Sequence, residues 1–144
     1  MIEIRRISST ETYDVRHPVL RKGMPRESCA FTGDDDEQTV HFGLFEDGLL
    51  VGIVSVFSAN HENFAGKQVQ LRGMAVLESH QGKGFGKMLI REAEKHAAGS
   101  GVEFIWFNAR INAVGFYQKM GYSIVGDAFD IPNIGIHYIM YRKL

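Results

Sequence analysis

The segment Gln81 to Lys87 is the feature that most constrains how this chain can fold. It reads Gln-Gly-Lys-Gly-Phe-Gly-Lys, follows an alternating apolar segment at Val69 to Val76, and precedes a helical pattern that extends to Ala98. Alternate glycines at such a junction leave backbone N–H groups uncovered at a helix N-terminus, where they have no intrahelical partner and the helix dipole is positive. The segment therefore predicts a strand, an anion-binding turn and a helix, with phosphate as the best-suited anion.

Two widespread phosphate-binding loops do not fit this segment. A P-loop needs a glycine where Gln81 stands and a Mg²⁺-binding hydroxyl where Met88 stands. The dinucleotide-binding fingerprint needs a glycine at Lys87, and Glu103, the acidic residue that follows, opens the next predicted strand instead of closing it. A nucleotide-binding α/β domain is therefore disfavoured.

Composition bounds the remaining possibilities. The chain has 144 residues, 44% of them hydrophobic, and a net charge of −1 without a basic stripe, so we expect one domain over residues 1–144 and neither nucleic acid nor membrane as a partner. The first residues lack a signal-peptide pattern, and the single Cys29 agrees with a reducing cytoplasm. We expect no metal site, since the acidic run Asp34–Glu37 lacks the EF-hand spacing and is interpreted as a solvated loop.

The first third of the chain predicts a strand, a helix and a long connection. Ile2 and Ile4 alternate with charged residues in the strand, and the capping box Ser8-x-x-Glu11 starts the helix, which we expect to end or bend at Pro18. The connection carries Arg21, Arg26 and the acidic run. A connection of this length is often a binding lid, but its opposite charges do not determine the charge of a ligand.

Further elements follow from turn signals and hydrophobic periodicity. Asp47-Gly48 predicts a hairpin of Thr39–Glu46 with Gly48–Ala59, in which Val51, Ile53, Val54, Val56 and Phe57 are core. Apolar residues from Phe85 to Ala97, including Met88, recur at helical spacing and predict a helix that ends at Gly99. A buried strand is predicted at Val102–Phe107, followed by a helix that Asn112 caps and Gly121 ends. The two last predicted strands are Tyr122–Val125 and Ile136–Arg142.

Two motifs in this order resemble those of the GCN5-related N-acetyltransferases. Gln81, Gly84 and Gly86 match the Q/R-x-x-G-x-G/A motif of that family. A second family pattern, N-x-x-A-x-x-F-Y-x-x-x-G-F, is matched except at its first position by Arg110, Ala113, Phe116, Tyr117, Gly121 and Tyr122. The resemblance covers most of the chain and implies an α/β fold with a mixed, mostly antiparallel sheet of about six to seven strands and helices on both faces.

The resemblance also implies a cofactor site. In this family the glycine loop holds the pyrophosphate of coenzyme A, and the strand before it splays from its neighbour and pairs with pantetheine. Carried over, the site comprises Met74, Ala75, Val76, Gln81, Gly82, Lys83, Gly84, Phe85, Gly86, Lys87, Asn108, Asn112, Phe116 and Tyr117. Arg110 replaces the motif Asn, which removes one expected polar contact.

The resemblance implies that Met74 and Tyr117 are the catalytic residues. The Met74 backbone N–H is placed to donate to the thioester oxygen, and Tyr117 matches the family tyrosine that commonly protonates the leaving sulfur. On spacing alone, a core position beside Phe116 is the better interpretation of Tyr117, whereas the motif match favours the general acid. No general base is identified: His41, His137 and Glu103 are candidates, and a water chain is an alternative.

The acceptor is the least defined part of the prediction. Arg72 cannot act as a base but could bind a carboxylate, and Arg21, Arg26, His41 and His137 are further candidate substrate residues. We expect an acetyl-CoA-dependent N-acetyltransferase acting on a primary amine of a small molecule or amino acid by direct attack, and exposed late strands make a homodimer possible. The alternatives are a non-catalytic acyl-CoA-binding sensor and a protein or peptide N-acetyltransferase.

Overall fold

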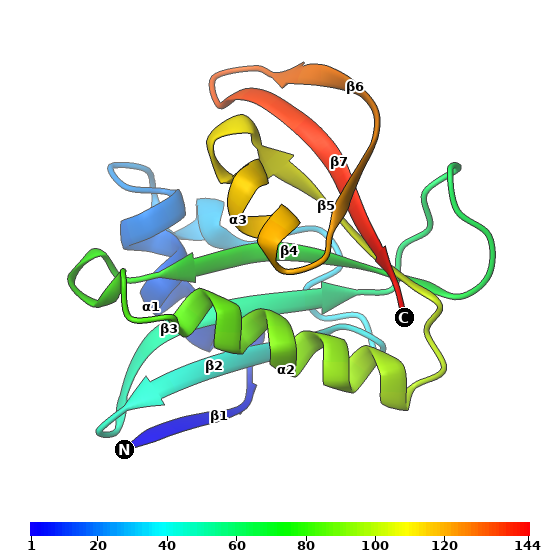
Figure 1. The fold of residues 1–144 in the computed structure, drawn as a ribbon. Coiled ribbons are helices and arrows are strands. Elements are labelled where there is room, and N and C mark those ends of the chain that lie inside the picture. Colours follow the sequence, from blue (N-terminus) through cyan, green and yellow to red (C-terminus); the bar gives the residue numbers. More distant parts are fainter.

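A computed structural model describes residues 1–144 as one seven-stranded sheet in the order β1-β2-β3-β4-β5-β7-β6 (Figure 1). Only β4 and β5 pair in parallel; all the other neighbours are antiparallel. The strands are β1 (Ile2–Ile7), β2 (Val40–Glu46), β3 (Leu49–Phe57), β4 (Gln68–Val76), β5 (Phe104–Arg110), β6 (Ser123–Ile131) and β7 (Gly135–Lys143). The helices are α1 (Ser9–Leu20), α2 (Phe85–Gly99) and α3 (Val114–Lys119). This arrangement confirms the predicted fold class.

Helix α1 begins as the sequence predicts but does not end where expected. Ser8 accepts from the Glu11 N–H, and Glu11 accepts from the Ser8 N–H, which completes the capping box. Of the two outcomes predicted at Pro18, an end or a bend, the end is wrong, since α1 continues to Leu20. Pro18 lies in the last turn, where few backbone bonds remain to be lost, and the Arg21 N–H closes the helix by donating to the carbonyls of Arg16 and His17.

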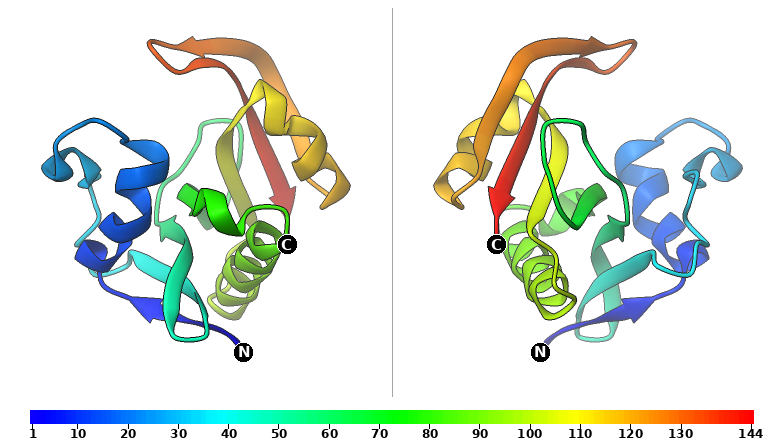
Figure 2. Two further views of the ribbon diagram at one scale, coloured as in Figure 1. Left: turned by 90° about the vertical axis from the view of Figure 1, so that its left-hand side faces the viewer. Right: turned by 90° about the vertical axis from the view of Figure 1, so that its right-hand side faces the viewer.

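The two long helices cover opposite faces of the sheet. In the views of Figure 2, α1 and α2 lie on either side of β2, β3 and β4. On the α1 face, Val15 packs against Ile53 and Ala75, whereas Leu89 and Ile90 of α2 belong to the larger core on the other face. Burying apolar surface on both faces of these strands stabilises the platform from which β4 extends.

The predicted hairpin and its core residues are confirmed. The prediction that Met88 of α2 is a core residue is wrong. Asp47 and Gly48 join β2 to β3, and the predicted core residues of β3 are all buried. Met88, expected in the core, is instead 39% exposed. None of the helices is long and apolar enough to cross a bilayer.

The last third of the chain differs from the predictions at element ends. The prediction that Asn112 caps the last helix is wrong, because a 3-10 turn at Ile111–Ala113 precedes α3 and no side chain caps it. Gly121 follows the C-cap with a positive φ of 96°, as predicted. Strand β6 extends to Ile131, beyond the predicted Val125, because pairing with β7 resumes at Phe129 after a register shift.

Candidate active site

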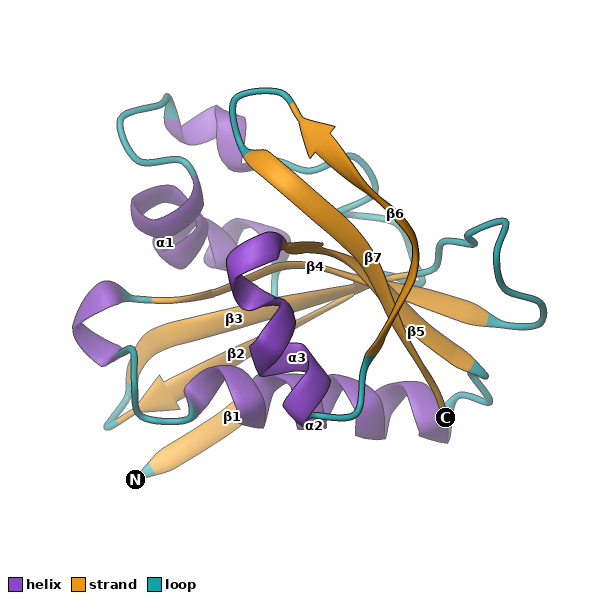
Figure 3. Cartoon of the chain, turned by 45° about the horizontal axis from the view of Figure 1, so that its top comes forward, coloured by secondary structure: helices purple, strands orange, loops and turns teal.

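The largest opening in the sheet is a splay between β4 and β5. These strands pair only where Gln68, Val69 and Gln70 face Phe104, Ile105 and Trp106, and they diverge towards their C-terminal ends (Figure 1). A cavity of about 410 Å³ occupies the opening. Its walls come from the end of α1 and the following loop, from β4, β5 and α3, and from the tip of the β6–β7 hairpin, which lies beside that loop in Figure 3.

The glycine loop at the end of β4 presents unpaired backbone donors. Gln81 Nε2 donates to the Val76 carbonyl at 3.0 Å and ties the loop to the strand. Gly84, with a φ of 82°, is the N-cap residue of α2, and the first backbone bond of that helix runs from the Met88 N–H to the Gly84 carbonyl. The N–H groups of residues 82–87 therefore have no partner within the chain.

The space around the loop is open, although one of its charges is already paired. A Cβ built on Gly82 or Gly84 would meet no atom within 4 Å. Lys83 Nζ lies 3.3 Å from Glu46 Oε1, so its charge is partly neutralised, whereas Lys87 has no such partner. The unpaired N–H groups and the dipole of the fifteen-residue helix α2 make this helix end a site for an anion.

Gly86 lies where three of the predicted cofactor-binding segments meet. A Cβ built there would lie 3.7 Å from Met74 Cε and 3.9 Å from Phe116 Cζ. Phe116 is 41% exposed, although its spacing places it on the same helical face as Met120, which is buried. The loop, β4 and α3 thus form one continuous surface from the helix end to the cavity.

A bulge in β4 distorts the strand beside the cavity. Ile53 of β3 faces Ala75 but Ser55 faces Arg72, so the register shifts around Gly73. Gly73 has a φ of 64°, and a Cβ there would lie 2.9 Å from Phe31 Cε2. Only glycine combines this conformation with so close an approach of an aromatic ring. Met74, immediately after the bulge, lines the cavity.

Tyr117 of α3 lines the cavity from the opposite wall. Its ring centroid lies 4.4 Å from that of Phe107, which holds the side chain against β5. Unlike the Tyr122 hydroxyl, which donates to Glu94 at 2.8 Å, the Tyr117 hydroxyl has no hydrogen-bond partner in the chain. Burial raises the pKa of Tyr117 to about 12, so the phenol is protonated at neutral pH.

His137 of β7 also lines the cavity and has a defined tautomer. Its Nδ1 lies 2.8 Å from the Gly135 carbonyl oxygen, which can only accept, so Nδ1 carries the proton. Nε2 is therefore left with its lone pair. The side chain is 4% exposed, and its partner across the β5–β7 ladder is Arg110, another cavity residue.

The structure separates the remaining candidate residues into two groups. Arg21, Arg72 and Asn108 line the cavity. Arg26 does not, because its guanidinium pairs with Asp14 at 2.9 Å, outside the cavity. Asn112 is exposed on the 3-10 turn and is not part of the cavity wall.

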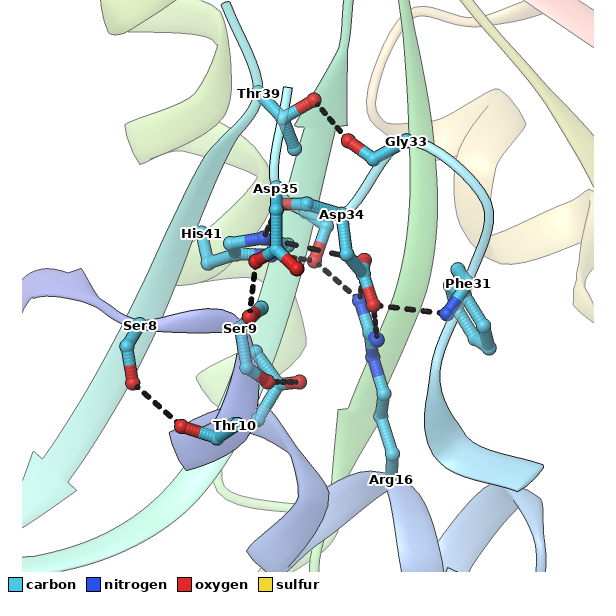
Figure 4. A network of polar contacts seen from close by, with 12 residues as sticks. Ser8, Ser9, Thr10, Arg16, Phe31, Gly33, Asp34, Asp35, Thr39 and His41 are labelled. Carbon is cyan, nitrogen blue, oxygen red and sulfur yellow. Dashed lines mark hydrogen bonds and ion pairs between the residues drawn. The ribbon is translucent and has the colours of Figure 1, made fainter. Parts of the chain in front are cut away.

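His41 is buried and hydrogen-bonded within the protein and does not line the cavity. Its Nδ1 lies 2.6 Å from Ser55 Oγ and its Nε2 donates to the Asp34 carbonyl at 2.9 Å (Figure 4). Both ring nitrogens are thereby occupied, and His41 lies outside the wall of this cavity. Glu103, a second candidate base, is likewise absent from the cavity wall.

The acidic run departs from the solvated loop expected for it at Asp34, whereas Asp35, Asp36 and Glu37 are exposed as predicted. Asp34 is 7% exposed and accepts two hydrogen bonds from Arg16, and Asp35 accepts from Ser9 Oγ at 2.6 Å (Figure 4). This packing brings Phe31 into the cavity wall, a position that no pattern in the sequence predicts. No local signal could have located this loop, because Arg16 and Asp34 are 18 residues apart and meet only in the folded chain.

Comparison with known proteins agrees with the geometry. The sequence profile of the acetyltransferase (GNAT) family matches residues 2–122. The uncharacterized N-acetyltransferase YitI of Bacillus subtilis (strain 168) is 40% identical over 146 residues, which cover 100% of this chain and 97% of YitI.

Solved structures share the fold at low identity. The ribosomal-protein-S18-alanine N-acetyltransferase of Escherichia coli has a TM-score of 0.76 at 17% identity, covering 99% of this chain and 94% of its own. An aminoglycoside 6'-N-acetyltransferase complexed with coenzyme A has a TM-score of 0.76 at 14% identity, covering 98% and 96%. The chain therefore belongs to the acetyltransferase (GNAT) family and is an N-acetyltransferase.

Proposed function

We propose that this protein transfers the acetyl group of acetyl-CoA to a primary amine of a small molecule or an amino acid by direct attack. The observation that carries the proposal is the position of the unpaired N–H groups of residues 82–87, which lie at the end of the same strand whose bulged segment lines the cavity. One extended ligand could therefore place its diphosphate at the helix end and its acyl group in the cavity.

The loop residues fit the diphosphate of coenzyme A. Uncovered N–H groups, a positive helix end and open space over Gly82 and Gly84 are what an anionic group needs to approach the main chain. Phe116 and Met74 would contact the less polar part of the ligand, since both flank Gly86. A structural neighbour carries coenzyme A, which supports the same ligand class here. When bound, acetyl-CoA supplies an acetyl group activated as a thioester.

The backbone of β4 would orient that acetyl group. From Leu71 to Val76 the strand has no partner on the side facing β5. Met74, Ala75 and Val76 therefore offer main-chain groups for an extended ligand to pair with, in the manner of an added strand. The Met74 N–H would donate to the acyl oxygen, and one such donor lowers the barrier by about 2.7–4 kcal/mol.

Two side chains of the cavity can move the protons that acetyl transfer requires. An alkylamine has a pKa near 10.4 and must lose a proton to act as a nucleophile. His137 Nε2, whose lone pair is fixed by the hydrogen bond at Nδ1, would accept that proton. The Tyr117 hydroxyl, protonated and without a partner, would donate its proton to the leaving sulfur.

Two alternative functions would use the same cofactor site but would differ in catalysis or in the acceptor. A non-catalytic acyl-CoA sensor would bind the ligand without using Tyr117 and His137. A protein or peptide acetyltransferase would need the cavity to admit a chain terminus or a lysine. The cavity behind the loop after α1 and the β6–β7 tip has a volume of about 410 Å³, which is in the range of small-molecule sites and favours a small acceptor.

The test has a binding arm and a turnover arm. Thermal unfolding with coenzyme A, ATP and NAD should show stabilisation by coenzyme A, with a ligand at 100 times its Kd adding about 2.7 kcal/mol. Release of free thiol from acetyl-CoA should then depend on an amine, including members of a peptide panel. Stabilisation without thiol release for any amine would favour the sensor, and no stabilisation by coenzyme A would contradict both.

Two further expectations stay proposals. A homodimer could form through β6, because it is an edge strand that pairs only with β7. Light scattering after size-exclusion chromatography measures the oligomeric state directly. A cytoplasmic location is compatible with the free, buried Cys29.

A further inference from the structure

The charged side chains that line the cavity are all basic. They are Arg21, Arg72 and Arg110, and no aspartate or glutamate contributes to the wall. The sequence left the sign of the acceptor undetermined because arginines and acids alternate in the loop after α1. The structure removes that ambiguity, since Asp34 and Asp35 face Arg16 and Ser9 instead of the cavity.

The cavity arginines lack carboxylate partners. Arg21 donates to the Leu20 carbonyl at 3.1 Å, and neither Arg72 nor Arg110 makes a hydrogen bond or ion pair within the chain. By contrast, Arg16, Arg26, Arg91 and Arg142 each pair with a carboxylate. The Arg72 side chain is half-buried, and an unpaired cation in such a position is costly unless a ligand supplies the countercharge.

Aromatic rings hold the Arg72 guanidinium in place. Its carbon lies 4.9 Å from the Phe31 ring centroid and 5.1 Å from that of Phe57. The Arg21 guanidinium lies 5.3 Å from the same Phe31 ring. Rings that contact an arginine face leave the N–H groups at its edge free to bind two oxygens of one anion.

Burial and the nearby charges of Arg16 and Arg21 lower the pKa of Arg72 and outweigh the opposing effect of the Asp34 charge, so the guanidinium lies in an environment unfavourable to its own charge. An arginine stays ionised even so. A bound anion would relieve both effects. The site is therefore arranged to bind a negatively charged group. The aromatic rings beside Arg72 limit its movement towards a carboxylate elsewhere in the chain.

We infer that the acceptor amine carries an anionic group, a carboxylate or a phosphate, which Arg72 and Arg21 bind at the Phe31 side of the cavity. This inference rests on the proposed acetyl transfer. Arg72 precedes Met74 by two residues, across the bulge at Gly73, and both line the same cavity. An amine beside Met74 and an anion on Arg72 therefore fit one small molecule.

The test compares acceptors that differ only in the anion. Thiol release from acetyl-CoA is measured with glycine, β-alanine, γ-aminobutyrate and the common amino acids, each beside its carboxamide, and with phosphoethanolamine beside ethanolamine. We expect the anionic member of the best pair to have a kcat/KM higher by at least about tenfold. Preference within the carboxylate pairs or the phosphate pair identifies the anion.

Variants connect the preference to the arginines. Arg72→Gln and Arg21→Gln should each reduce the ratio of anionic to neutral kcat/KM, whereas Arg26→Gln, an exposed arginine outside the cavity, should leave it unchanged. Arg72→Lys, which keeps the charge but loses the two-point contact, should fall between wild type and Arg72→Gln. Circular dichroism and melting temperature establish that each variant is folded.

Three outcomes decide the inference separately from the proposed function. Thiol release with equal or better rates for neutral members overturns the anionic acceptor and leaves acetyl transfer intact. If no acceptor releases thiol, calorimetric titration of the coenzyme A-saturated protein with the same acids decides: binding that Arg72→Gln removes supports the inference, and no binding of any acid overturns it. Coenzyme A binding in the same calorimeter reports on the cofactor site independently.

Discussion

Arg16 and Asp34 form a two-point ion pair in the interior, with Nη1 to Oδ2 at 2.7 Å and Nη2 to Oδ1 at 2.9 Å (Figure 4). Arg16 also donates to the Cys29 carbonyl and to Ser55 Oγ, and its guanidinium lies 3.8 Å from the Phe31 ring centroid. One buried arginine thus joins α1, β3 and the loop that carries Phe31. The wall of the acceptor cavity depends on this pair, although neither residue of the pair lines it.

Breaking the buried pair should destabilise the fold strongly. Arg16→Met and Asp34→Asn each leave an unpaired charged or polar partner in the interior, and the free energy of unfolding should fall by about 3–5 kcal/mol. Urea titration followed by fluorescence of the single Trp106 measures it. The exposed pair of Arg26 and Asp14 supplies the control, because Arg26→Gln should leave the unfolding midpoint nearly unchanged. Equal losses for buried and exposed pairs would contradict the role of Arg16.

The same pair predicts how stability depends on pH. Burial acts to raise the pKa of the Asp34 carboxyl, but hydrogen bonds from Arg16 and the Phe31 N–H, with the Arg16 charge, outweigh it and hold that pKa below its usual value. The stability it contributes is therefore complete above the unfolded pKa, near 3.9, and is lost as pH falls through the lower folded value. The stability gap between wild type and Asp34→Asn should be constant from pH 7 to pH 5 and close only in stronger acid. A gap that closes near neutral pH would contradict it.

Tyr117→Phe should separate binding from turnover. Without the hydroxyl, kcat should fall by roughly 10²–10⁴, the usual range for a general acid, while the Kd of coenzyme A stays nearly constant. Tyr122→Phe makes the same chemical change at a hydroxyl bound to Glu94, outside the cavity, and should leave kcat near wild type. Equal turnover of Tyr117→Phe at saturating acetyl-CoA would remove the assignment. Because burial raises the pKa of Tyr117 to about 12, its ionisation should cause no fall in rate between pH 7 and pH 10.

His137→Gln should change the acidic side of the pH–rate profile. If Nε2 accepts the amine proton, the dependence of kcat/KM on a deprotonated base should disappear along with most of the rate. His41→Asn is the matched comparison, since His41 lies buried between Ser55 and Asp34, and it should lower the melting temperature without altering the shape of the profile. An unchanged profile in His137→Gln would leave a water chain as the base.

Local signals in the sequence predicted several helix starts and turns correctly. The capping box at Ser8 and Glu11, the Asp47-Gly48 turn and the glycine loop each place a structural event within a few residues, because the interactions that cause it are local. Periodicity likewise identified most of the buried face of α2. Periodicity failed at Met88, because the spacing of a residue shows which helix face it lies on but not whether another element packs against that face.

The acceptor side could not be read in the same way. Arg16 and Asp34 pair across the connection after α1, and Phe31 reaches Gly73 of β4 only once that connection is folded. Such contacts depend on tertiary packing, so the acidic run appeared to be solvated and Arg26 and His41 appeared equivalent to Arg21 and Arg72. Burial and pairing, which only the structure supplies, separate the cations used in folding from those left for a ligand.

The central claim is that the amides of the glycine loop bind the diphosphate of the cofactor. Backbone amide NMR of the ¹⁵N-labelled protein during titration with coenzyme A tests it most directly, and pantetheine, which lacks the diphosphate, is the matched control ligand. The amide resonances of Gly82, Gly84 and Gly86 should shift with coenzyme A. Those of Gly82 and Gly84 should stay in place with pantetheine, whereas Gly86 flanks Met74 and Phe116 and responds to either ligand. Saturation by coenzyme A with these three resonances unmoved would contradict the claim.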